Sequence, residues 1–181
     1  VYKRQRLWHT KGETLADAMA LTQPPDFKRT RSCWQSAQHA SVDGARRQCG
    51  VCAACMLRRL SMFTAGIEEP SDTYVWENLG VSDFDSGAAA TFQRHTPALR
   101  EHGIAGVLHM DNLAALASPY AQPRLVRRVA RLTADALGED EALVLEKTQA
   151  LLGRHAEEWR RFVAAQGHRS FVARYAASAA A

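Results

Sequence analysis

The sequence has no run of about 18 apolar residues, the length that a membrane-spanning helix requires. Its first residues, VYKRQRLWHTKGE, contain no apolar stretch of signal-peptide length. Cysteine is missing from residues 1–32 and 56–181, so the disulfide framework of a small secreted domain is not indicated. These absences predict a cytoplasmic protein without a membrane partner.

Glycine-rich phosphate-binding loops are also missing. The 11 glycines form no Walker pattern and no other loop of that kind. The histidines of the second half (His95, His102, His109, His155 and His168) show no H-E-x-x-H or paired spacing. We therefore expect neither a backbone cradle for nucleotide phosphates nor a second metal site in this chain.

The composition is that of a globular protein, with 46% apolar and 23% charged residues and a formal net charge of +4 over 181 residues. The basic residues are scattered rather than gathered with aromatics, which argues against nucleic-acid binding. Arginines do flank the cysteines, at positions 46, 47, 58 and 59. We expect them to offset the negative charge of metal-bound thiolates.

All four cysteines lie between Ser32 and Arg59. Cys49, Cys52 and Cys55 form C-x-x-C-x-x-C, and Cys33 lies upstream. Four thiolates at this spacing suit one tetrahedral zinc ion. Gly50 suits a knuckle turn that points backbone N–H groups at the sulfurs, and residues 34–48 are expected to form a polar loop over the metal.

Three other uses of the cysteines compete with zinc. Cysteines three residues apart bridge poorly, which disfavours two disulfides. An iron–sulfur run of this type normally ends in C-P, whereas Met56 and Leu57 follow Cys55. A thioredoxin-like C-x-x-C would not need four cysteines. Structural zinc is the interpretation that we favour.

Hydrophobic periodicity predicts a mainly α fold. Residues 11–21 form an expected helix with Thr10 and Glu13 as a capping box, and a second expected helix, 53–65, grows directly out of the cysteine site. Its apolar side would carry Leu57, Leu60, Met62 and Phe63, with Arg58 and Arg59 on the other side. Further helices are predicted at 88–100 (interrupted by Pro97), 103–116, 123–137 and 140–166, and in a short segment around residues 171–175.

The predicted helix 123–137 has a clear apolar stripe, which we expect to lie in the core: Leu125, Val129, Leu132 and Ala136. Arg127, Arg128 and Arg131 fall on the other side.

Four motifs resemble the C-terminal part of the QueC family, the 7-cyano-7-deazaguanine synthases. They are T-K-G-E at 10–13, T-R-S-C at 30–33, Q-C-G-V-C-A-A-C-M-L-R-R at 48–59 and F-T-A-G-I-E-E-P at 63–70. Together they cover about residues 8–74.

The resemblance implies an ATP-dependent ligase of the 7-deazapurine and queuosine pathways. Its α/β adenine-nucleotide-hydrolase-like (P-P loop) part would use ATP and Mg²⁺ to activate 7-carboxy-7-deazaguanine, which ammonia converts to the nitrile. By the same resemblance Cys33, Cys49, Cys52 and Cys55 bind structural zinc. Lys11 and Arg58 would lie near substrate or ATP. The alternatives are a solvated helix start for Lys11 and thiolate charge compensation for Arg58.

This chain departs from the family in several ways. The ATP loop S-G-G-x-D-S is absent, Glu69 replaces the usual Asp before Pro70, and the chain runs on for roughly a hundred residues. It begins with Val1 and reads as a fragment. We therefore expect a zinc-binding C-terminal part at 1–75 and a helical extension at 76–181, inactive as a synthase by itself.

Longer QueC-like proteins of bacterial anti-phage gene clusters are similar in architecture. A different class of function stays open. The chain would then be a non-catalytic, zinc-stabilised helical module that binds a protein or nucleic acid. A homodimer is compatible with either class.

Overall fold

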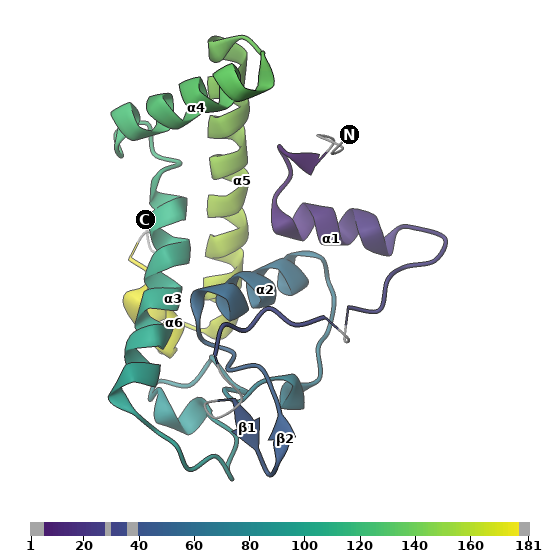
Figure 1. Ribbon diagram of the computed structural model, residues 1–181. Helices are drawn as coiled ribbons and strands as arrows, with labels where there is room; N and C mark the ends of the chain where they lie inside the picture. The colour runs from purple at the N-terminus through teal and green to yellow at the C-terminus, as the bar shows by residue number, and fades with distance from the viewer. Residues whose placement is uncertain (1–5, 28–29, 36–39, 178–181) are drawn as a thin grey trace.

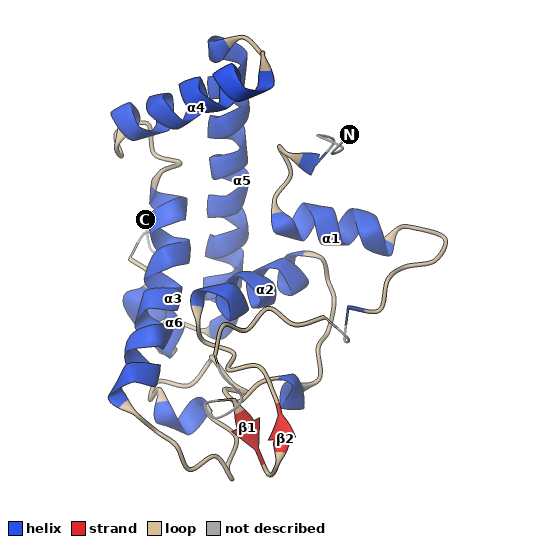
Figure 2. Cartoon of the chain, viewed as in Figure 1, coloured by secondary structure: helices blue, strands red, loops and turns tan. Residues whose placement is uncertain are grey.

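The computed structural model describes residues 6–27, 30–35 and 40–177. Within these residues the fold is mainly α, as predicted (Figure 2). The helices are α1 (Lys11–Met19), α2 (Ala53–Thr64), α3 (Pro97–Ala115), α4 (Pro123–Leu137), α5 (Glu141–Gln166) and α6 (Phe171–Tyr175). Short 3-10 turns occur at Ser71–Thr73 and Asp85–Gly87.

The segment predicted as a loop over the metal contains a small hairpin. Strands β1 (Ser41–Val42) and β2 (Ala45–Arg46) pair antiparallel, with Val42 opposite Ala45. The turn residues Asp43 and Gly44 both have positive φ, at 50° and 76°. Asp-Gly is a strong signal for such a two-residue turn, so the hairpin was readable from the sequence. Residues 36–39 of the predicted loop lie outside the described residues.

The first two helices begin where the sequence predicts. At α1 the Thr10 side chain accepts a hydrogen bond from the Glu13 amide at 3.0 Å. The Glu13 carboxylate accepts one from the Thr10 amide at 2.7 Å, which completes the capping box. Helix α2 starts directly after Cys52, so the last metal-ligand candidate, Cys55, lies in its first turn.

The prediction of a helix at 88–100 interrupted by Pro97 is wrong. Pro97 occupies the first turn of α3, where its missing N–H costs nothing, and Thr96 caps the helix by accepting from the Leu99 amide. Residues 88–96 precede the helix as extended and turn structure, and the Ala89 amide donates to the Val75 carbonyl at 2.7 Å. Helix α3 then continues unbroken through the segment predicted as a separate helix.

Helices α3 and α5 pack along each other and α2 packs against both (Figure 1). One cluster of buried side chains runs from Ala40 to Ala176 and is centred on Trp76 and Trp159. Val75 and Trp76, which lie on either side of the predicted boundary, are both fully buried in it. The two predicted parts share this core, and their division at residue 75 stays a prediction.

Helix α4 contradicts the prediction of which face is buried. Its contacts with α5 use small side chains and one valine: Val126, Ala130 and Ala134. The stripe predicted as core is instead exposed at Leu125, Val129 and Leu132, with exposed fractions of 42%, 46% and 55%.

No helix in the described ranges is both long enough and apolar enough to cross a membrane.

Candidate metal centre

The four predicted ligands converge. The sulfur atoms of Cys33, Cys49, Cys52 and Cys55 all lie within 4.8 Å of one another, and all four cysteines are free of disulfides. Cys49, Cys52 and Cys55 are buried and Cys33 is half-buried. In the described part of the chain this is the only group of three or more Cys, His, Asp or Glu side chains close enough to share an ion.

Backbone amides hold the sulfurs in place. The Cys49 amide donates to Cys33 Sγ at 3.1 Å, and the Cys52 amide donates to Cys49 Sγ at 3.3 Å. Gly50 makes this turn possible with φ at 85°. A Cβ at Gly50 would lie 3.0 Å from both the Trp76 carbonyl oxygen and the Tyr74 Cβ, so only glycine fits. The predicted knuckle turn is therefore present.

The spacing of the sulfurs fits a tetrahedral thiolate site. Zinc bound by sulfurs at about 2.3 Å places neighbouring sulfurs about 3.8 Å apart. The Cys49 and Cys55 sulfurs are 3.8 Å apart. The N–H···S bonds would also stabilise thiolate charge. The four cysteines therefore form a site that could hold a metal ion such as zinc.

Without a bound cation the four thiols have different pKa values, so some are protonated and others are not. Pairing with the Cys49 thiol lowers the pKa of Cys33 to about 6, and the same pairing raises the pKa of Cys49. Pairing with Cys33 lowers the pKa of Cys52 and raises the pKa of Cys55. Four thiolates this close repel one another, so some keep their protons. A divalent cation would displace these protons and bind all four sulfurs.

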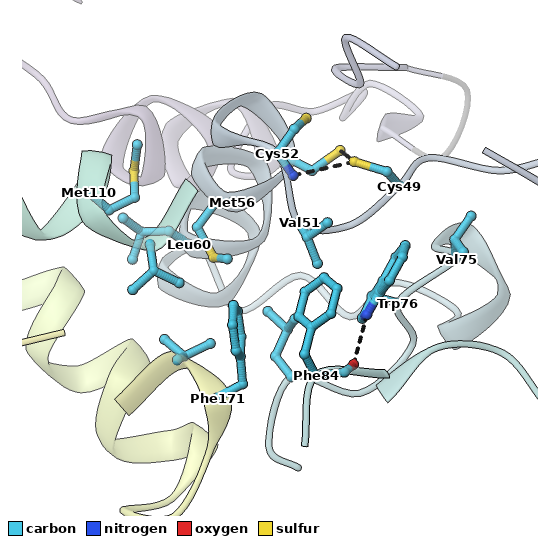
Figure 3. Packing of buried hydrophobic residues seen from close by; sticks show 14 of the residues in the cluster. Cys49, Val51, Cys52, Met56, Leu60, Val75, Trp76, Phe84, Met110 and Phe171 are labelled. Carbon is cyan, nitrogen blue, oxygen red and sulfur yellow. Dashed lines mark hydrogen bonds between the residues drawn. The ribbon is translucent and has the colours of Figure 1, made fainter. Parts of the chain in front are cut away.

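The site sits against the hydrophobic core. Figure 3 shows Cys49, Val51 and Cys52 lying over the cluster that contains Met56 and Trp76. Helix α3 approaches this segment closely at Gly106, where an added Cβ would lie 2.2 Å from the Val51 carbonyl oxygen. The cysteine segment therefore packs closely against α3 within this core.

Of the four flanking arginines, Arg59 is the one whose charge acts on the thiols. Its guanidinium lies 3.9 Å from the centre of the Tyr74 ring and donates to the Trp76 carbonyl. Burial lowers the pKa of Arg59, and the negative charge of groups that include Cys55 and Cys49 acts in the opposite direction. Arg47 pairs with Glu77 at 2.6 Å instead, and Arg46 is exposed.

Arg58, predicted on the outer side of its helix, is buried in a polar network. It pairs with Glu69 at 2.7 Å and donates to the Thr30 hydroxyl at 2.7 Å and the Phe27 carbonyl at 2.8 Å. Glu69 also accepts from the Tyr74 hydroxyl, whose pKa burial raises. The network ties α2 to the segments before and after it. The only sequence signal for this network is an arginine within an apolar helical period, Arg58, with the carboxylate of Glu69 eleven residues later.

Lys11 and Arg58 line one cavity of about 460 Å³, bounded by α1, α2, α3 and residues 27–34. Lys11 is exposed, and within the described residues it has no acidic partner. Trp34, with 75% of its surface exposed, and His109 also line the cavity. Its described lining includes no Asp or Glu, so the cavity is basic. Neither Trp34 nor His109 was predicted as a site residue.

The described geometry thus brings the four cysteines together, and it places Lys11 and Arg58 around a basic cavity beside them. It does not leave Arg58 free, because three groups already occupy its donors. Comparison with known proteins finds no matching family model, no matching curated protein and no matching solved structure.

Proposed function

We propose that Cys33, Cys49, Cys52 and Cys55 bind one structural zinc ion, and that this chain is the zinc-binding part of a 7-cyano-7-deazaguanine synthase-like ligase. The observation that supports the zinc site is the convergence of the four sulfur atoms within 4.8 Å of one another, together with the N–H···S bonds that hold them. All four positions are filled by protein, which is typical of a structural rather than a catalytic zinc site.

The ligase half of the proposal rests on the four motifs and on the basic cavity beside the cysteines. Three of the motifs contribute to its lining, through Lys11, residues 30–32 and Arg58. A planar, negatively charged acid such as 7-carboxy-7-deazaguanine suits a cavity that offers an aromatic face at Trp34 and a free ammonium at Lys11.

Lys11 and Arg58 would have different roles in this cavity. Arg58 is held by Glu69, Thr30 and Phe27, so it shapes the wall. Lys11 is free to meet the carboxylate of the acid. Activation by ATP and Mg²⁺ would be supplied by the α/β part of the parent protein, and ammonia would be the second substrate. We expect no nitrile formation by this chain alone.

Calorimetric titration of the zinc-loaded chain with 7-carboxy-7-deazaguanine tests the ligase half. We expect saturable binding that weakens about tenfold or more in Lys11→Gln, because a charge-assisted contact is lost. Lys147→Gln on α5 is the matched control and should bind like wild type. Absence of saturable binding, or equal affinity of Lys11→Gln and wild type, would contradict the proposal. ATP-dependent nitrile formation would contradict the expected inactivity.

A second candidate function is a non-catalytic, zinc-stabilised helical module that binds a protein partner. The specific observation in its favour is the exposed apolar stripe of α4. This candidate is favoured if the chain binds a partner protein saturably and does not bind 7-carboxy-7-deazaguanine.

A further inference from the structure

The outer face of α4 carries apolar side chains that no described residue covers. Leu125, Val129 and Leu132 are each about half exposed, and Ala136 is exposed one turn further along. The opposite face, with Ala130 and Ala134, packs on α5 around Val144. Helix α4 therefore has two apolar faces, and among the described residues only the face of small residues packs against another element.

The spacing of the exposed stripe is that of a coiled-coil seam. Leu125, Val129, Leu132 and Ala136 follow one another at intervals of four, three and four residues, which places leucines at d positions and valine at an a position. Such a narrow seam fits the stripe of a single partner helix, whereas a lipid surface contacts a broader apolar face. Valine at a with leucine at d favours a two-helix pair.

Charge narrows the choice of partner. Arg124, Arg128 and Arg131 lie along one flank of the seam, with Arg128 at a g position, whereas Arg127 lies at f on the far side of the helix. Asp135, at the other g position, is the only acid in α4. None of these arginines forms an ion pair with a described residue. Two α4 helices from two copies of the chain would bring together two segments that each carry four arginines and one aspartate, which is less favourable than pairing with an acidic helix. The flank is complementary to glutamates or aspartates on another protein.

The seam is also accessible to a partner and lies on an ordered helix. Helix α4 crosses the end of α5 at the end of the molecule opposite the β1–β2 hairpin (Figure 1). The αL residue Gly138 and the Asp140 cap fix the turn into α5. Because α4 is already ordered by α5, a partner would not have to bear the cost of folding it.

We propose that the seam Leu125–Val129–Leu132–Ala136 of α4, with its arginine flank, binds an acidic amphipathic helix of a partner protein as a two-helix coiled coil. This does not depend on the ligase assignment, because no residue of the seam lines the basic cavity.

The test uses the zinc-loaded chain and a fluorescent three-heptad peptide with valine at a, leucine at d and glutamate at e and g. A second peptide with lysine in place of glutamate is the charge control. Fluorescence anisotropy should show saturable binding of the glutamate peptide and none of the lysine peptide. The double variant Leu125→Gln/Leu132→Gln should weaken binding about tenfold or more. Leu108→Gln, at an equally exposed leucine of α3, should not.

A charge swap tests whether the arginine flank recognises the charge of the peptide. Arg128→Glu should weaken the glutamate peptide and gain affinity for the lysine peptide, whereas Arg169→Glu should do neither. Several outcomes would overturn the proposal: no saturable binding of the glutamate peptide, equal binding by the double variant, or seam-dependent binding of phosphatidylserine vesicles or duplex DNA in place of the peptide. Seam-dependent self-association in sedimentation velocity would overturn it in favour of a second copy.

Discussion

Gly106→Ala perturbs the contact between α3 and the cysteine segment. The added methyl group would sit 2.2 Å from the Val51 carbonyl oxygen and 3.2 Å from the Cys52 carbonyl carbon. Both neighbours are backbone atoms, so no side chain can rotate away. Either α3 or the turn that holds Cys49 and Cys52 must move by most of an ångström.

Two opposing effects set the magnitude. Alanine is favoured over glycine within a helix by up to about 1 kcal/mol. Overpacking of a well-packed site costs about 1–3 kcal/mol. We expect a net loss of about 1–2 kcal/mol, which lowers the Tm of a chain of this size by about 2–8 °C. Gly153→Ala on α5 has open space around the new methyl group and should raise the Tm by about 2–4 °C instead.

Thermal unfolding followed by circular dichroism on the two zinc-loaded variants measures this difference. Zinc release to a colorimetric chelator should also be faster in Gly106→Ala, because the strain falls on the turn between Cys49 and Cys52. Gly153→Ala has the same helix propensity change without the clash, so it isolates the packing effect. Equal Tm shifts and equal zinc release in the two variants would refute the close approach of α3 to the metal centre.

Three further predictions follow from the centre and its surroundings. Elemental analysis of Cys49→Ser should find less than one zinc ion per chain. Removing zinc from the wild-type chain with a chelator should accelerate hydrogen exchange in residues 30–65 before other segments. If exchange in α5 accelerates earlier, a structural role of the metal is contradicted. Arg58→Met leaves Glu69 buried without its cation and should cost about 3–5 kcal/mol in urea unfolding, partly recovered by adding Glu69→Gln. Burial lowers the pKa of His155, so its imidazole binds a proton at higher pH in the unfolded chain than in the folded chain. The free energy of unfolding should therefore fall as pH drops through about 6.5, and it should fall less steeply in His155→Gln. Identical pH dependence of the two proteins would rule out this contribution of His155.

The sequence predicted features that depend on local chemistry. Thr10 and Glu13 form a capping box within four residues, and the cysteine spacing with Gly50 defines a knuckle turn, so neither needs tertiary information. The helix that follows Cys52 was likewise predicted within one residue of its observed end. Local hydrogen bonds decide these features, and the sequence contains both partners of each bond.

Features that depend on distant neighbours were not predicted. Pro97 is compatible with either a helix interruption or a helix start. The pairing of Ala88 and Ala89 with Trp76 and Val75, which lie far back along the chain, holds the start of residues 88–96 out of a helix. Arg58 is usually a surface residue type, and its burial follows from Glu69 and from the Thr30 and Phe27 segment folding back over α2. Burial of an arginine is decided by partners that lie far along the chain.

Helix α4 shows why periodicity alone misassigns a face. A stripe of leucine and valine looks more like core than a stripe of alanine does, but alanines allow α4 to approach α5 closely. Two substitutions separate the two assignments. Leu132→Ala should change the free energy of unfolding by less than about 0.5 kcal/mol, because the side chain is already half in solvent. Ala130→Leu should cost about 1–3 kcal/mol, because Ala130 is fully buried against α5. If Leu132→Ala instead costs the 2–5 kcal/mol typical of a core leucine and Ala130→Leu is neutral, the stripe lies in the core and the partner-binding seam of α4 does not exist.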